Sequence, residues 1–133
     1  MVAKINRGAS LYGAIIYNQQ KVNEDTARII AGNRMITDSL YDPDRIVRQT
    51  MFAFESYLAA NRNTEKPILH ISLNPTLDDN LTDSQFADLA RAYMQKMGYG
   101  NQPYIVYLHE DIDRRHIHIV SCLLYTSDAA DEE

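Results

Sequence analysis

Three of the four histidines in the chain lie close together in sequence, as His109, His116 and His118. Alternate side chains of a β-strand share a face, so His116 and His118 would project together while Ile117 and Ile119 face the other side. His109 ends the preceding apolar segment, and a hairpin would bring it back to the pair. Three converging imidazoles can bind a divalent metal ion and leave positions open for water or a substrate oxygen. The pattern predicts a three-histidine metal site, although a lone histidine would more often be structural.

Two carboxylates, Asp111 and Asp113, lie in the charged segment between these histidines. Each could accept a hydrogen bond from an imidazole and so orient a metal ligand. The alternative is a solvated loop in which they lie beside Arg114 and Arg115. The sequence leaves both interpretations open.

Four short segments have the composition and the turn boundaries of β-strands. They run from Val2 to Asn6, from Pro67 to Leu73, from Pro103 to His109 and from His116 to Ser121. Only the charged segment separates the last two, which favours a hairpin between them.

Apolar residues at helical spacing predict three main helices. Ser10 can cap the first, Asp42 followed by Pro43 opens the second, and Thr82 begins a capping box before the third. The segment from Thr26 to Ala31 is expected to form a further short turn of helix. The order of elements is then strand, helix, helix, strand, helix, strand, strand. It predicts an α+β fold in which helices cover an antiparallel β-sheet.

The charge of the chain needs to be divided before it is interpreted. The formal net charge is −5, from 13 basic and 18 acidic side chains. Four of the acidic residues follow residue 121, namely Asp128, Asp131, Glu132 and Glu133, so the first 121 residues carry 13 basic and 14 acidic side chains. This nearly neutral body argues neither for nor against DNA binding, and a bound cation would add positive charge.

Length and apolar content suit one soluble domain. The chain has 133 residues, 45% of them hydrophobic, which is enough for a single core. No apolar run approaches the ~18 residues that span a bilayer, and the N-terminus lacks the apolar core of a signal peptide. The single cysteine, Cys122, cannot form an internal disulfide. A cytoplasmic location without membrane insertion is therefore expected.

A longer segment around the histidines resembles the third motif of the relaxase/mobilisation nucleases, the MobA-type conjugative relaxases of the HUH endonuclease superfamily. It reads YLHEDIDRRHIHIV from Tyr107 to Val120. Upstream, LHISLNP from Leu69 and LTD from Leu81 follow in the order of that family, and SLYGAIIYN from Ser10 resembles its first motif. The family often has an asparagine shortly after the histidine pair, where this chain has already changed to Cys122.

The resemblance implies a relaxase-like HUH fold and a specific chemistry. Tyr17 matches the nucleophile by spacing, with Tyr12 as the second choice and a core or surface role as the alternative. The tyrosine would attack the scissile phosphate of single-stranded DNA at an origin of transfer, giving a 5′-phosphotyrosine and a free 3′-hydroxyl. A phenol is a weak acid, so its proton must be removed with help from the metal or from a base, for which Asp111 is the candidate.

The resemblance also implies ligands and partners. His109, His116 and His118 would hold the divalent ion, Mg²⁺ or Mn²⁺ first and Zn²⁺ as the alternative. Ser72 matches the second motif and would contact DNA near the scissile phosphate, unless its hydroxyl only makes a local turn bond. His70 is on the same strand face as Ser72 and either lines the groove or is structural. Accessory mobilisation proteins are expected as further partners.

The last twelve residues differ from the rest. The segment 122–133 resembles the translation of a sequencing adapter, so residues 1–121 are interpreted as the N-terminal part of a relaxase catalytic domain and 122–133 as a non-native tail. A natural acidic C-terminus is the alternative. In either case Cys122 is expected to have no functional role.

Two other functions remain open from the sequence. One is a metal-dependent phosphodiesterase in which water, not tyrosine, attacks phosphorus. The other is a DNA-binding module with an inactive site. Both keep the fold, and they differ from a relaxase in whether a covalent protein–DNA product forms.

Overall fold

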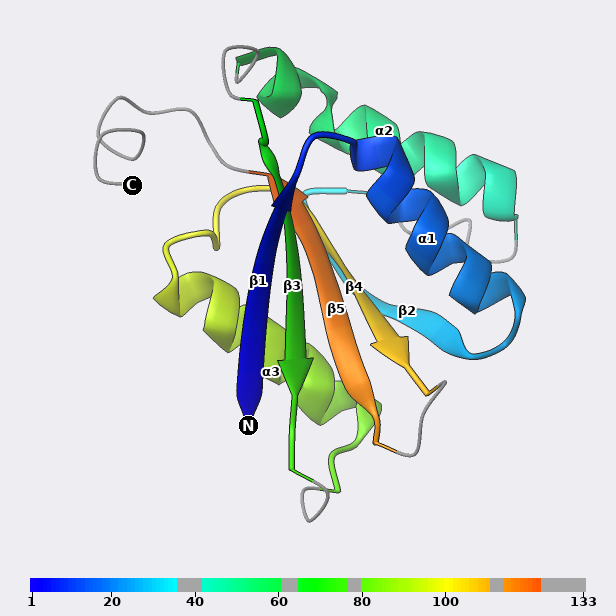
Figure 1. Ribbon diagram of the computed structural model, residues 1–133, viewed down its shortest axis with the longest axis vertical. Helices are drawn as coiled ribbons and strands as arrows, with labels where there is room; N and C mark the ends of the chain where they lie inside the picture. Colours follow the sequence, from blue (N-terminus) through cyan, green and yellow to red (C-terminus); the bar gives the residue numbers. More distant parts are fainter. Residues whose placement is uncertain (36–41, 61–64, 77–79, 111–113, 123–133) are drawn as a thin grey trace.

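The computed structural model describes residues 1–35, 42–60, 65–76, 80–110 and 114–122. These residues form five strands and three helices (Figure 1). The strands are β1 (Val2–Gly8), β2 (Ala27–Asn33), β3 (Ile68–Asn74), β4 (Tyr104–His109) and β5 (His116–Cys122). The helices are α1 (Leu11–Asn23), α2 (Pro43–Ala60) and α3 (Asp83–Lys96).

The strands form one sheet in the order β1-β3-β5-β4-β2, with every neighbouring pair antiparallel. Strand β5 is central, and β1 and β2 are the edges. The α+β fold with an antiparallel sheet under helices is therefore confirmed. β5 extends to Cys122, one residue beyond the expected end at Ser121, and Cys122 pairs with Ile68.

The prediction for Thr26 to Ala31 was wrong, because this segment is the edge strand β2 and not a turn of helix. Helix α1 ends before it, at Asn23, and Asp25 reverses the chain with a φ of 61°. A turn of helix this short gains little on its own. Pairing with β4 instead satisfies the backbone groups of Ala27 to Asn33 that face β4, with a shift of register between Ile29 and Ala31.

The helices cover the two faces of the sheet separately, as Figure 1 shows: α3 lies on one face and α1 and α2 lie together on the other. Under α3, the side chains of Phe86, Ala90 and Met94 pack on alternate residues of the strands, including Ile117 and Ile119. Each large apolar side chain buried in this way contributes about 1.5–3 kcal/mol relative to exposure.

The other face has a second apolar cluster. The helices supply Leu11, Ile15 and Phe54 to it. The strands supply Ile68, Ile105, Tyr107, Val120 and Cys122. Burial raises the pKa of the Cys122 thiol to about 12, so this side chain is a core residue and a poor nucleophile.

Local sequence signals define the helix ends. The Ser10 side chain accepts a hydrogen bond from the backbone N–H of Gly13 at the start of α1. Before α3, Thr82 and Gln85 make the two reciprocal bonds of the expected capping box. At the end of α3, Gly98 takes a φ of 87°, which glycine adopts without a steric penalty, and the Tyr99 N–H bonds the Met94 carbonyl.

Within the described residues, no helix combines the length and apolar character that a membrane span requires.

Candidate metal centre and nucleophile

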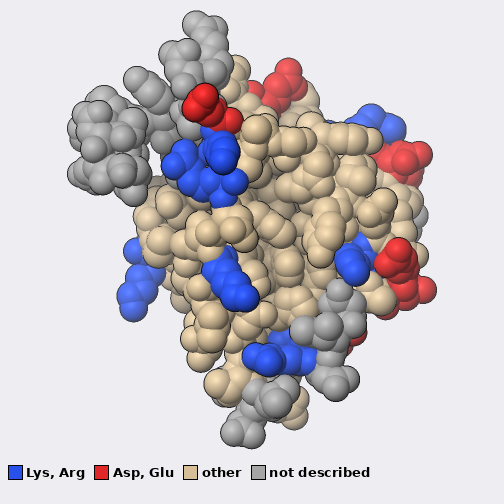
Figure 2. Space-filling view, viewed as in Figure 1, with Lys and Arg blue, Asp and Glu red and all other residues tan. Residues whose placement is uncertain are grey.

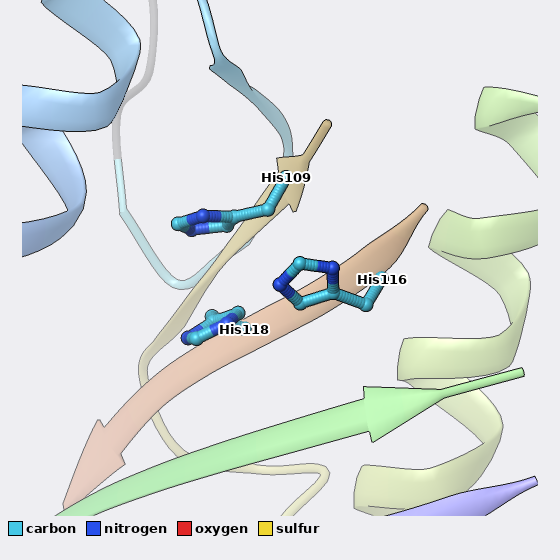
Figure 3. A group of neighbouring side chains, drawn as sticks. All are labelled: His109, His116 and His118. Atoms are coloured by element: carbon cyan, nitrogen blue, oxygen red, sulfur yellow. The ribbon is translucent and has the colours of Figure 1, made fainter. Parts of the chain in front are cut away.

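The hairpin of β4 and β5 brings the three histidines together on the α1/α2 face of the sheet (Figure 3). His109 lies directly opposite His116, and His118 lies two residues further along β5 on the same face. The ring centroids of His109 and His118 are 4.1 Å apart, and those of His116 and His118 are 5.0 Å apart. One nitrogen of each ring lies within 4.8 Å of one nitrogen of the others. The convergence expected from the sequence is present, and metal binding by it stays a prediction.

Each histidine has a partner behind it that orients its ring. His109 Nε2 is 2.8 Å from Asn18 Oδ1 on α1. His116 Nδ1 is 3.1 Å from the carbonyl oxygen of Arg114, and His118 Nδ1 is 2.9 Å from His70 Nε2 on β3. A histidine that donates one ring N–H to such a partner carries its lone pair on the other nitrogen, which is the form that binds a metal.

Burial shields the histidine cluster from solvent. His109 and His116 are buried, and His118 is partly buried. Desolvation by burial lowers the pKa of His70 below its ordinary value. A neutral His70 ring can accept the N–H of His118, as a ring orienting a metal ligand must.

Tyr17 lies at the edge of this cluster. Its ring packs edge-on against His70, with 6.4 Å between the ring centroids. The side chain is 47% exposed, so solvent or a nucleic acid can reach it. Tyr12 is also exposed, but five residues of helix turn it about 140° away from Tyr17. The expected nucleophile thus contacts a residue that itself bonds a histidine of the trio.

A network of opposite charges joins the base of the hairpin to α3 and β2. Asp83, in the first turn of α3, lies 2.8 Å from Arg28 and 2.7 Å from Arg115. Glu110 lies 2.7 Å from the same Arg28. Hydrogen bonding to Arg28 lowers the pKa of Asp83 and raises that of the guanidinium. The network ties together the elements that carry His109 and His116.

A family model for the MobA/VirD2-like relaxase nuclease domain matches residues 17–127. This match covers most of the chain, begins at Tyr17 and includes all three clustered histidines. The chain belongs to the relaxase family. A search of curated proteins and a search of solved structures found no significant match to this chain. Relaxases of this family cut DNA during mobilisation.

Of the other predicted site residues of this relaxase, the structure describes the position of Ser72 but not those of Asp111 and Asp113. Ser72 lies on β3 directly opposite His118, so it is next to the cluster, and its hydroxyl accepts a bond of 2.8 Å from Asn74 Nδ2. Both expectations for it, nearness to the site and a local bond at the strand end, are compatible with this position. Asp111 and Asp113 lie in segment 111–113, outside the residues that the structure describes.

Sequence reasoning missed two participants. Asn18 was noted only as the residue after Tyr17, yet it is fully buried against His109. The sequence gives Arg115 a place only in the alternative of a solvated loop, yet it bonds Asp83 and the Leu81 carbonyl and lies over the Phe86 ring. An asparagine at a position of α1 that faces the sheet was the one signal that could have indicated the first.

Proposed function

We propose that this relaxase domain nicks and rejoins one strand of DNA at the origin of transfer of a mobile element, with Tyr17 as the nucleophile. One observation supports this most directly: Tyr17 packs against His70, and His70 is within hydrogen-bonding distance of His118. A nucleophile and a candidate metal centre are thereby joined through a single side chain.

The three histidines fit a divalent ion. Their ring nitrogens converge, and each ring has a partner that can select the nitrogen offered to the ion. We propose Mg²⁺ or Mn²⁺ as the ion, with Zn²⁺, to which imidazole ligands are well suited, as the alternative. When bound, the ion would supply polarisation of the scissile phosphate and neutralise charge that develops on its oxygens.

The residues of the chain perform the exchange itself. The Tyr17 phenolic oxygen attacks phosphorus and forms a phosphotyrosine bond, while the bond from phosphorus to the 3′ oxygen breaks. The phenol proton leaves to a base, for which Asp111 is proposed, and the departing 3′ oxygen gains a proton. Since one phosphoester replaces another, the reverse attack by the 3′-hydroxyl rejoins the strand.

The exposed face of β1 beside the histidines offers a place for single-stranded DNA. Lys4 and Asn6 of β1 are exposed and lie opposite Ser72 and His70, on the same face as the histidines. In the view of Figure 2, Lys and Arg side chains approach the middle of the surface, while Asp and Glu lie mainly near its rim. Cations placed in this way attract phosphates even when the net charge is negative. We propose that Ser72 contacts the strand near the scissile phosphate, and that the reaction takes place in the cytoplasm with accessory mobilisation proteins.

A covalent adduct distinguishes this function from its alternatives. The full chain is incubated with overlapping single-stranded oligonucleotides from the origin of transfer of its own element, with Mn²⁺ or with EDTA. We expect a metal-dependent nick and a protein–DNA adduct that survives denaturing electrophoresis. Tyr17→Phe should abolish both, and Tyr12→Phe, its matched control on the same helix, should retain both.

Each contrary result would indicate a different function or a different nucleophile. Cleavage that persists in Tyr17→Phe without an adduct would indicate a phosphodiesterase that uses water. Binding of the oligonucleotide without cleavage, unchanged by EDTA, would indicate a DNA-binding module. An adduct lost in Tyr12→Phe and kept in Tyr17→Phe would transfer the nucleophile to Tyr12.

A further inference from the structure

Asn18 connects helix α1 to the histidine cluster through a fully buried contact. Its side-chain oxygen lies 2.8 Å from His109 Nε2, and its side-chain nitrogen donates to the Ala14 carbonyl at 2.9 Å. The second bond determines which end of the amide faces His109, because only the nitrogen can donate to a carbonyl. The amide oxygen is thus the acceptor, and His109 Nε2 must be the donor.

This contact gives His109 a different arrangement from the other two histidines. With its proton on Nε2, the His109 ring carries its lone pair on Nδ1. His116 directs Nδ1 at the Arg114 carbonyl, which can only accept, and so carries its lone pair on Nε2. His118 directs Nδ1 at His70 and carries its lone pair on Nε2 when it is the donor in that pair. The three rings would therefore offer one Nδ1 and two Nε2 atoms to an ion.

Asn18 is also the residue that directly follows Tyr17. Tyr17 is half-exposed and packs against His70, whereas Asn18 is fully buried and contacts His109. A shift of α1 as a rigid body therefore moves the Tyr17 ring and the Asn18 amide together. Adjacent residues of one helix thus serve the two halves of the site.

We propose that Asn18 is a positioning residue that presents His109 to the metal through Nδ1 and couples metal binding to the placement of the helix that carries Tyr17. This inference rests on the proposed metal site of the relaxase. Coupling between two sites is reciprocal. An ion bound at the histidines should therefore restrain α1, and loss of the Asn18 contact should lower the affinity of the histidines for the ion.

The first test measures metal affinity by calorimetric titration of the full chain with Mn²⁺ and Zn²⁺. Asn18→Leu keeps the side-chain size and removes the acceptor, and we expect metal affinity to fall by about 10- to 100-fold, as for other residues that orient metal-bound histidines. Asn18→Asp restores an acceptor and should bind at least as tightly as the wild type. The matched control is Gln19→Leu, which removes a buried amide that bonds Asn23 within the same helix, and it should bind as the wild type does.

The second test follows hydrogen exchange of the α1 amides, Leu11–Asn23, with and without Zn²⁺. We expect the ion to slow exchange in the wild type and in Gln19→Leu, and to leave α1 exchange unchanged in Asn18→Leu. A merely structural role for Asn18 would raise exchange equally with and without the ion. Circular dichroism establishes that each variant is folded.

The third test needs no variant, so it stands even if Asn18→Leu does not fold. Nitrogen-15 spectra of the histidines in the Zn²⁺-loaded wild type should show His109 bound through Nδ1 and the other two through Nε2. Coordination of His109 through Nε2 overturns the inference, as does unchanged affinity in a folded Asn18→Leu. If the wild type binds neither ion, the metal site of the proposed function fails first, and the inference falls with it.

Discussion

The two faces of the sheet are built from the same strands and yet have different tasks. Under α3, the residues of the three inner strands are mainly apolar and buried, among them Ile71, Val106, Ile117 and Ile119. On the α1/α2 face, apolar residues such as Ile105 and Val120 fill only one end, and the histidines with Ser72 occupy the other. One face therefore serves mainly stability, whereas the other combines an apolar end with an end that carries the proposed metal site.

Neighbouring residues of β5 should separate these two tasks most sharply. His118→Ala removes a proposed metal ligand, and we expect the nicking rate to fall by at least about 10²-fold, since a bound ion supplies several kcal/mol of transition-state stabilisation. Ile119→Ala, on the opposite face, should lower the free energy of unfolding by about 2–5 kcal/mol through lost burial and the cavity left behind.

Nicking assays and urea denaturation of both variants, without added metal, measure this difference. The comparison fails if His118→Ala costs as much unfolding free energy as Ile119→Ala, or if a folded Ile119→Ala loses nicking to the same degree.

The helix caps on the two faces offer a smaller and subtler contrast. Ser10→Ala and Thr82→Ala each remove a side-chain acceptor at a helix start, and each should cost about 0.5–2 kcal/mol of unfolding free energy. Only Ser10 begins the helix that carries Tyr17, so only Ser10→Ala should also slow nicking at a temperature where both variants are folded. Equal nicking rates in the two variants would show that fraying at the start of α1 does not reach the nucleophile.

The smallest expected effect concerns the charge network at the base of the hairpin. The folded-state pKa of Asp83 is lowered, chiefly by its hydrogen bond to Arg28. Its contribution to stability is therefore present above the unfolded-state pKa and is lost as the pH falls through the lowered folded-state pKa. Both partners are about half exposed, so Asp83→Asn should cost at most about 1 kcal/mol at pH 7.

Denaturation at pH 7 and near pH 3 measures this contribution. The difference in the free energy of unfolding between wild type and Asp83→Asn should be smaller at the lower pH. A difference that widens on acidification would mean that Asp83 is not held in its charged form by the arginines.

The sequence predicted the parts that depend on local patterns. Capping residues at Ser10 and Thr82 placed the starts of α1 and α3 correctly, and alternation with a short connection predicted the hairpin that brings His109 back to His116. The α+β class followed from the order of elements. The motif order predicted the family that the family model then showed.

The parts that escaped prediction depend on distant neighbours. The segment from Ala27 to Asn33 is too short for its periodicity to distinguish helix from strand, and its partner β4 lies more than seventy residues later. Asn18 meets a histidine 91 residues away, and His70 meets one 48 residues away. No local sequence pattern predicts such contacts, because they arise from the order of the strands in the sheet.

The central position of β5 has a consequence for how the site keeps its shape. All three clustered histidines belong to strands that are hydrogen-bonded on both sides, His109 to β4 and His116 and His118 to β5. Strands in that position are among the last to open in local fluctuations of a domain, whereas a surface helix such as α1 opens more readily. In the proposed site, the imidazoles on β4 and β5 would thus form the rigid part, and adjustment to an incoming substrate would fall to α1, which carries the phenol of Tyr17.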